Sequence, residues 1–188
     1  NADRTRPNPQ KDRSGALLGK VILTPGGGQR HVFTLEHVDK TSDYELLTAR
    51  SKPPLAATSV LGSTSFTDMQ RSRATWEGSW RVNSAFADDV KATLSWQDAH
   101  SREYITEDRN TAADRVRDVT YDERTWQANL QGSKVLRNGS RCVQKITYGL
   151  DYTAAKVENL QTGVTPPTGE TFPLKRFPDT TETSTALY

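Results

Sequence analysis

An alternation of apolar and polar side chains between Arg73 and Gln97 constrains the fold of this chain more than any other feature. Before a turn, apolar residues occupy the even positions Ala74, Trp76, Gly78, Trp80 and Val82. After the turn they return at Val90, Ala92, Leu94 and Trp96. Because alternate side chains of a β-strand project from the same face, both runs are typical of half-buried strands. The stretch therefore predicts a hairpin whose two strands share one apolar face.

The same alternation recurs along the chain and predicts four further strands, at residues 15–24, 31–41, 120–134 and 142–156. Three glycines at residues 26–28 predict one tight turn, and Asn138-Gly139 within R-N-G-S-R predicts another. The terminal T-S-T-A-L-Y has the composition of a strand that has only begun. We therefore expect an all-β chain, an antiparallel up-and-down meander of about six to seven strands that forms one unit over residues 1–188.

Long polar connections, at about residues 43–67, 101–118 and 157–181, are expected to alternate with the short turns. Outer-membrane barrels have this arrangement, with short turns on one side of the membrane and long loops on the other. A common apolar face also predicts the register of the three hairpins. We expect Val21 opposite Phe33, Trp76 opposite Trp96, and Trp126 opposite Tyr152.

Composition limits the classes of protein to which the chain can belong. Only 34% of the 188 residues are hydrophobic and the mean hydropathy is -0.75, as expected if each strand has one wet face. The 25 basic and 23 acidic residues are too balanced to indicate a nucleic-acid partner. A single cysteine excludes an intramolecular disulfide and a cysteine-based zinc site.

Periodicity alone leaves open whether the apolar face meets a protein core or lipid. The apolar set mixes tryptophan and tyrosine with glycine and alanine, a roughness that lipid accommodates better than a close-packed core. A lipid-facing wall is therefore favoured. The alternative is a soluble β-barrel or β-sandwich binding protein with the apolar face inside.

Several segments, taken in order, resemble the barrel of a known family. They are D-R-S-G-A-L-L-G-K-V, H-V-F-T-L-E-H-V-D-K, R-S-R-A-T-W, T-Y-G-L-D-Y and K-R-F-P-D-T-T-E-T-S-T-A-L-Y. Together they are similar to the middle of the barrel of TonB-dependent outer-membrane receptors, in the branch that serves haem, haemoglobin and transferrin. The resemblance implies a barrel of about 22 strands with an N-terminal plug. It also implies uptake of haem or another iron compound across the outer membrane of a Gram-negative bacterium.

The sequence departs from that family by omission. It contains no TonB box, no plug and no F-R-A-P or N-P-N-L type motif. We therefore expect a segment of a larger transmembrane β-barrel, whose strands form the wall and whose long loops face the ligand. The expected partners are the lipid bilayer, haem or a haem or iron-carrier protein, and the TonB system through parts absent from this chain.

Candidate chemistry is sparse, and we expect no catalytic residues, no metal site and no cofactor, with haem at most a transported ligand. His100 and Tyr104 are the candidate ligand-binding residues, because a histidine nitrogen and a tyrosine oxygen can both coordinate haem iron. The sequence has no nucleophile elbow and no glycine-rich phosphate loop followed by lysine. We therefore expect a protein that is not an enzyme.

Overall fold

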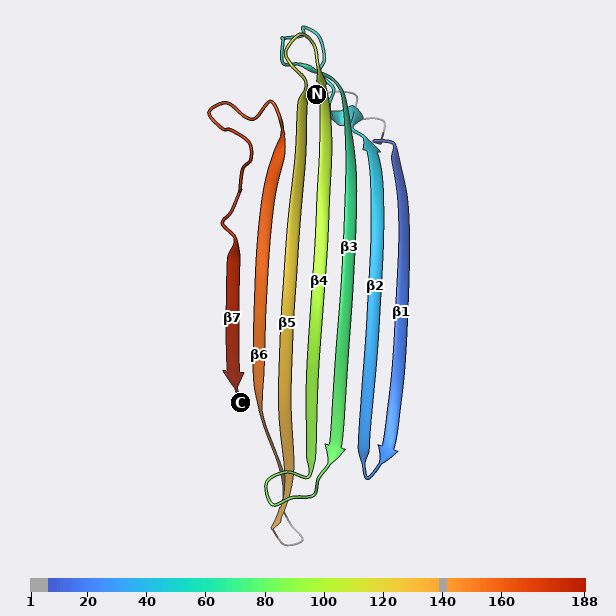
Figure 1. Ribbon diagram of the computed structural model, residues 1–188, viewed down its shortest axis with the longest axis vertical. Coiled ribbons are helices and arrows are strands. Elements are labelled where there is room, and N and C mark those ends of the chain that lie inside the picture. The colour runs from blue at the N-terminus through green and yellow to red at the C-terminus, as the bar shows by residue number, and fades with distance from the viewer. Residues whose placement is uncertain (1–6, 139–141) are drawn as a thin grey trace.

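The computed structural model describes residues 7–138 and 142–188 and consists of one antiparallel sheet of seven strands (Figure 1). The strands are β1 (Gln10–Gly26), β2 (Gln29–Glu45), β3 (Val60–Arg81), β4 (Asp89–Arg109), β5 (Arg115–Asn138), β6 (Cys142–Val164) and β7 (Thr180–Leu187). A short 3-10 helix, η1 (Leu47–Ala49), follows β2. Each strand pairs with its neighbours in chain order and the sheet is not closed, since β1 and β7 are its two edges. The predicted all-β meander is confirmed.

The strands are longer than the sequence pattern predicts, so the expected long connections are wrong in extent. Strand β4 continues to Arg109 and β5 begins at Arg115, which leaves residues 110–114 as the connection where 101–118 was expected. The other two connections shrink to residues 46–59 and 165–179. In these extensions apolar residues are few and do not alternate regularly with polar ones, so no pattern marks the strands. Pairing with neighbouring strands and cross-strand ion pairs maintain the extended backbone there instead.

The register keeps the predicted faces but differs in detail. Val21 lies opposite Phe33, as expected. Trp76 lies opposite Leu94 and Trp126 opposite Ala154, so both of these pairings are displaced by two residues from the prediction. A two-residue step leaves every side chain on its original face, so the pattern could not detect it. The turn expected at 137–141 lies partly outside the described residues.

Hydrogen bonds within residues 82–88 explain the displaced pairing of β3 with β4. The amide of Val82 donates to the carbonyl of Asp88, and the amide of Ser84 donates to the carbonyl of Ala87. Asn83 adopts a left-handed backbone conformation with φ of 46°. This compact loop closes the hairpin with Arg81 opposite Asp89, and the register of both strands follows from that pair.

One face of the sheet carries a continuous apolar band near the turns that join β1 to β2, β3 to β4 and β5 to β6. A row across it runs through Val21, Phe33, Trp76, Leu94, Ala128 and Tyr152 on successive strands. The large side chains of this apolar band are Leu17, Val21, Leu23, Phe33, Leu35, Trp76, Trp80, Val90, Leu94, Trp96, Trp126, Leu130, Ile146, Tyr148, Leu150 and Tyr152. All four tryptophans of the chain lie in it.

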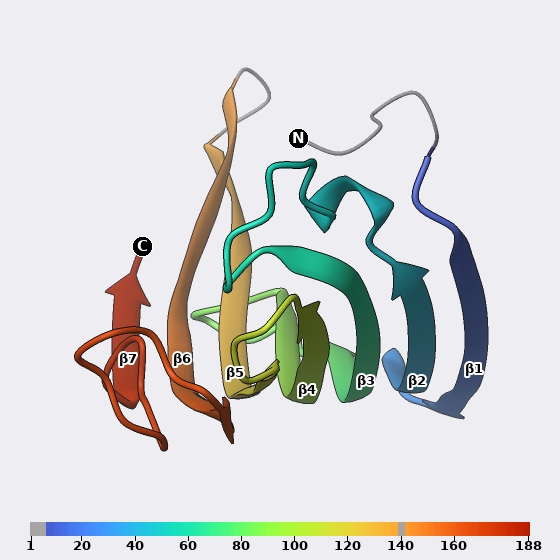
Figure 2. The same ribbon diagram turned by 90° about the horizontal axis from the view of Figure 1, so that it is seen from above.

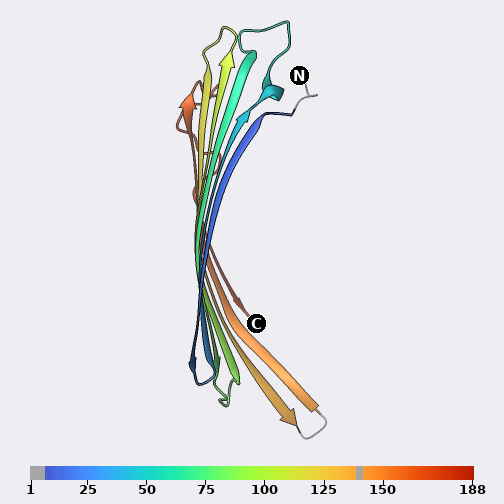
Figure 3. The same ribbon diagram turned by 90° about the vertical axis from the view of Figure 1, so that its right-hand side faces the viewer.

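The opposite face is mainly polar on β3 to β6 but carries Leu18, Ile22 and Val32 on β1 and β2, and it is the more enclosed of the two. Among the described residues, the buried polar side chains are Ser42, Ser63, Ser65, Ser95, Asn159 and Gln161, and all six lie on this polar face. Among the residues that the structure describes, the only buried apolar side chains are Val32, on this face, and Ala87, in the loop 82–88, whereas Leu17 of the apolar band is 71% exposed. Figures 2 and 3 show the curvature of the sheet. Within the described sheet, large apolar side chains are therefore exposed while several polar side chains are buried.

In the described part of the chain, no helix has the length and apolar character needed to cross a membrane.

Candidate functional site on the polar face

His100 and Tyr104 both lie on β4, His100 in the middle of that strand and Tyr104 further along it, within residues 101–118 where a connection was expected. They share a face with the apolar band but lie beyond it, in a more polar region. Nδ1 of His100 is 2.6 Å from Oδ1 of Asp122, and the guanidinium of Arg102 lies 5.7 Å from the centre of the Tyr104 ring. Residues four apart on a strand are separated by about 13 Å. The structure therefore does not bring the two side chains together around one iron.

The surroundings of His100 and Tyr104 form a charged belt, defined by Asp98, His100, Arg102, Asp118, Asp122 and Arg124. Arg102 donates two hydrogen bonds to the carboxylate of Asp118, at 2.8 and 2.6 Å. Arg124 lies 3.4 Å from Asp98. Each ion pair joins β4 to β5, so the belt holds together the strand extensions beyond the apolar band.

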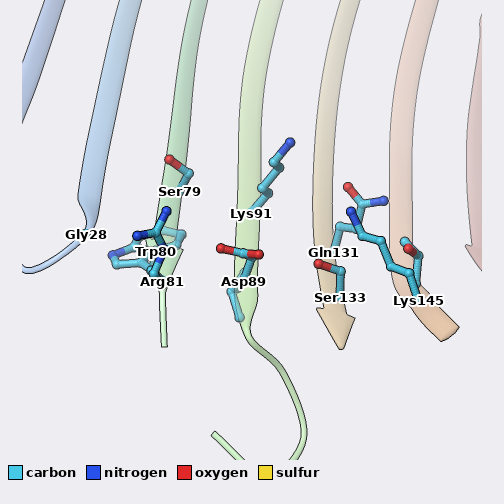
Figure 4. A pocket seen from close by; sticks show the side chains of 11 residues that line it. Gly28, Ser79, Trp80, Arg81, Asp89, Lys91, Gln131, Ser133 and Lys145 are labelled. Carbon is cyan, nitrogen blue, oxygen red and sulfur yellow. The ribbon is translucent and has the colours of Figure 1, made fainter. Parts of the chain in front are cut away.

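A groove on the polar face lies across β3 to β6, near the short turns (Figure 4). It has a volume of about 450 Å³, and its charged lining consists of Arg81, Asp89, Lys91 and Lys145. Gln131 and Ser133 add neutral hydrogen-bonding groups. Three cations against one carboxylate make this groove suited to a polar, anionic solute.

The closing turn of the first hairpin shapes the edge of this groove. Gly28 accepts a hydrogen bond from the amide of Arg81 at 3.0 Å and has a φ of +74°. A Cβ at residue 28 would lie 2.8 Å from Cβ of Arg81. Glycine at this position therefore lets β3 pass close to the turn, which places Arg81 beside the groove.

Asp88 anchors the loop 82–88 to β5 beside the groove. Its carboxylate accepts hydrogen bonds from Nζ of Lys134 at 2.6 Å and from the amide of Val135 at 2.8 Å. These two donors, Lys134 first, hold the pKa of Asp88 below its ordinary value near 3.8. The carboxylate thus stabilises the folded state above the unfolded pKa, and this contribution is lost as the pH falls through the lower folded pKa.

We expect Asp88→Asn to destabilise the protein at neutral pH, because the amide lacks the charge that binds Lys134. The difference in the free energy of unfolding between the variant and wild type should be constant above about pH 5. It should shrink as the pH falls below the ordinary pKa of the carboxyl group. Chemical unfolding across this pH range measures it. Asp89→Asn removes the same charge one residue away, from a side chain without an ion pair among the described residues, and is the control. A pH-independent difference would contradict the assigned role of Asp88.

The alternation assigns Arg81, Lys91, Gln131 and Lys145 to the polar face, because each lies next to an apolar position of its strand. The structure brings these four residues together. Sequence reasoning missed the charged residues at the far end of β4 and β5, because it placed them in a loop. The signal was present in the two-residue spacing of Glu107 with Arg109 and of Arg115 with Arg117, which assigns each pair to one face of a strand.

Within the described ranges, no three histidine, cysteine, aspartate or glutamate side chains cluster as metal ligands. Comparison with known proteins adds no identification: no protein-family model matches the chain, and a search of the curated proteins finds no match.

Proposed function

We propose that this sheet forms part of the wall of a transmembrane β-barrel in an outer membrane, with the apolar band against lipid and the polar face lining the interior. The observation that supports the proposal is the reversed distribution of side chains, apolar on the exposed face and polar on the enclosed one. A barrel strand with water on its inner side and lipid on its outer side needs polar side chains facing inward and apolar side chains facing outward.

The dimensions of the apolar band fit this role. From Val90 to Trp96 on β4 and from Ile146 to Ala154 on β6, the band extends about 20 to 26 Å along the strands. The apolar zone of an outer-membrane barrel is about 25 Å tall. A membrane crossing needs about 9–11 residues, so strands of 21 to 24 residues extend well beyond it. The charged belt begins where the apolar band ends, at the level of the expected headgroups.

The edges of the sheet add a requirement. In hydrocarbon each unpaired backbone amide or carbonyl costs several kcal/mol, so open sheet edges do not occur there. The outer sides of β1 and β7 carry no partner strand in the described chain. The proposal therefore includes further strands beside β1 and β7, supplied by other polypeptide or by copies of this sheet, that close the barrel.

Transport is the function that such a wall would serve. The groove lined by Arg81, Lys91 and Lys145 faces the proposed interior and suits an anionic solute, and haem with its two carboxylates belongs to that class. We therefore propose an uptake receptor or transporter for haem or another anionic iron compound. In this proposal the polar face contacts the cargo, and His100 and Tyr104 on the opposite face do not.

Brominated lipids test the proposal, because bromine quenches tryptophan fluorescence on contact and all four tryptophans lie in the apolar band. We expect strong quenching in vesicles of brominated lipid. Tryptophans that remain accessible to an aqueous quencher and insensitive to bromine would overturn the proposal.

A further inference from the structure

Three arginines surround one glutamate on the polar face, where residues 110–114 connect β4 to β5. This end of the two strands is the one remote from the apolar band. Glu107 and Arg109 belong to β4, and Arg115 and Arg117 belong to β5, on either side of the connection 110–114. Glu107 and Arg115 are direct cross-strand partners. We call these four residues the arginine cluster. Two of its charges are unbalanced, since three guanidinium groups share a single carboxylate.

The contacts to Glu107 are long for charge-assisted hydrogen bonds. Its carboxylate lies 3.5 Å from Arg109, 3.6 Å from Arg115 and 3.6 Å from Arg117. Well-formed pairs of guanidinium and carboxylate have distances of about 2.7–2.9 Å. One carboxylate located between three guanidinium groups cannot approach each of them closely, so it leaves them incompletely bonded.

Each arginine of the cluster has a buried Nε–H donor without a hydrogen-bond partner among the described residues. The side chain of Arg109 is only 8% exposed, so water has little access to it. An unsatisfied buried donor destabilises the folded protein, and a charged donor does so more strongly than a neutral one. Three such donors within one cluster are left for water or a bound ligand to satisfy.

Asp114 does not supply the missing acceptor to these guanidinium groups. Asp114, in the connection, accepts a hydrogen bond from the backbone amide of Arg109 at 2.9 Å. In the described chain it makes no ion pair with the three guanidinium groups. On the neighbouring strand β6, Gly163 lies opposite Arg117 and contributes no side-chain acceptor.

We propose that the arginine cluster binds a dianionic tetrahedral oxyanion, the phosphate group of a solute. The Nε–H and an Nη–H of a guanidinium form a planar fork that matches two oxygens of a phosphate. Three guanidinium groups would offer donors to several phosphate oxygens. A charge of minus two on the phosphate balances the excess positive charge of the cluster. The proposal depends on the geometry of the sheet alone and holds whether or not the sheet lies in a membrane.

Inorganic phosphate is the probe, added to the full chain in whichever medium, buffer or detergent, keeps it monodisperse. Isothermal titration calorimetry at constant ionic strength, balanced with chloride, gives the dissociation constant. We expect saturable binding by wild type. Arg115→Gln and Arg117→Gln should each weaken binding at least about tenfold, since each removes a charged donor. Both side chains are partly exposed, at 28% and 37%, so their replacement is compatible with folding.

Two further variants separate a phosphate site from general charge attraction. Glu107→Gln removes the competing carboxylate and should tighten binding several-fold, a gain that structural damage would not produce. Arg73→Gln removes a positive charge from the same face but outside the cluster, and should leave the dissociation constant unchanged. The absence of saturable binding by wild type would overturn the proposal. An equal loss of phosphate affinity in Arg73→Gln and Arg115→Gln would also overturn the proposal.

Discussion

Leu130→Arg is expected to lower the free energy of unfolding of the bilayer-inserted protein by about 2–4 kcal/mol, the cost of arginine on the lipid face near the bilayer midplane. Leu130 lies in the middle of the apolar band, between Ala92 on β4 and Leu150 on β6, and is 51% exposed on the sheet. In water an arginine at so exposed a site would be nearly neutral, because surface substitutions usually change stability by less than about 0.5 kcal/mol. A large penalty therefore arises only if the exposed surface is covered by hydrocarbon.

Gln127→Arg is the matched control for Leu130→Arg. Gln127 lies on the same strand, β5, three residues away and on the polar face. It receives the same new side chain, which there remains in contact with water, so we expect almost no change in stability. Urea unfolding from phosphatidylcholine vesicles, followed by tryptophan fluorescence, compares the two variants. Equal effects of both substitutions would contradict the assignment of the two faces.

Gly163→Ala is expected to destabilise the sheet by about 1–3 kcal/mol, because both the backbone and the available space at this position require glycine. Gly163 has a φ of +142°, which side chains with a Cβ rarely adopt. An added Cβ would overlap the carbonyl oxygen of Val116 on the paired strand. The strands β5 and β6 must separate there to admit a methyl group, and this displaces Arg117 of the arginine cluster.

Gly19→Ala provides the comparison for Gly163→Ala. Gly19 lies within β1, and a Cβ built there meets no atom within 4 Å. We expect a change within about 0.5 kcal/mol, as for other unobstructed surface positions. Urea unfolding of both variants measures the difference. A Gly163→Ala protein as stable as Gly19→Ala would show that β5 and β6 do not pair closely at this position.

The sequence was sufficient to predict which strands form and which faces their side chains share. Trp76, Leu94 and Trp126 mark three strands because each alternates with polar neighbours. Strand extent could not be predicted in the same way. On β4 beyond Trp96, adjacent residues such as Arg102 and Glu103 are both charged, so the alternation disappears although the backbone pairing continues. Ion pairs between strands cannot be identified before the strand register is known.

The candidate site could be predicted only in part, again because the strand register was not known from the sequence. The polar face was identified, because parity assigns Arg81, Lys91 and Lys145 to it. The arginine cluster was not, because Arg115 and Arg117 become neighbours of Glu107 only when residues 110–114 form a tight connection. His100 was chosen for its chemistry, and its ion pair with Asp122 depends on a strand pairing that the pattern did not contain.

Intrinsic tryptophan fluorescence provides the most direct test of the central claim, that the apolar band faces lipid. Trp76, Trp80, Trp96 and Trp126 all report on that face without any substitution. A control in which the four are replaced by phenylalanine and Gln127 by tryptophan reports on the polar face instead. In vesicles of brominated phosphatidylcholine, we predict strong quenching of the native tryptophans and weak quenching of the control, with the order reversed for aqueous acrylamide. Native tryptophans that acrylamide quenches and bromine does not would contradict the account.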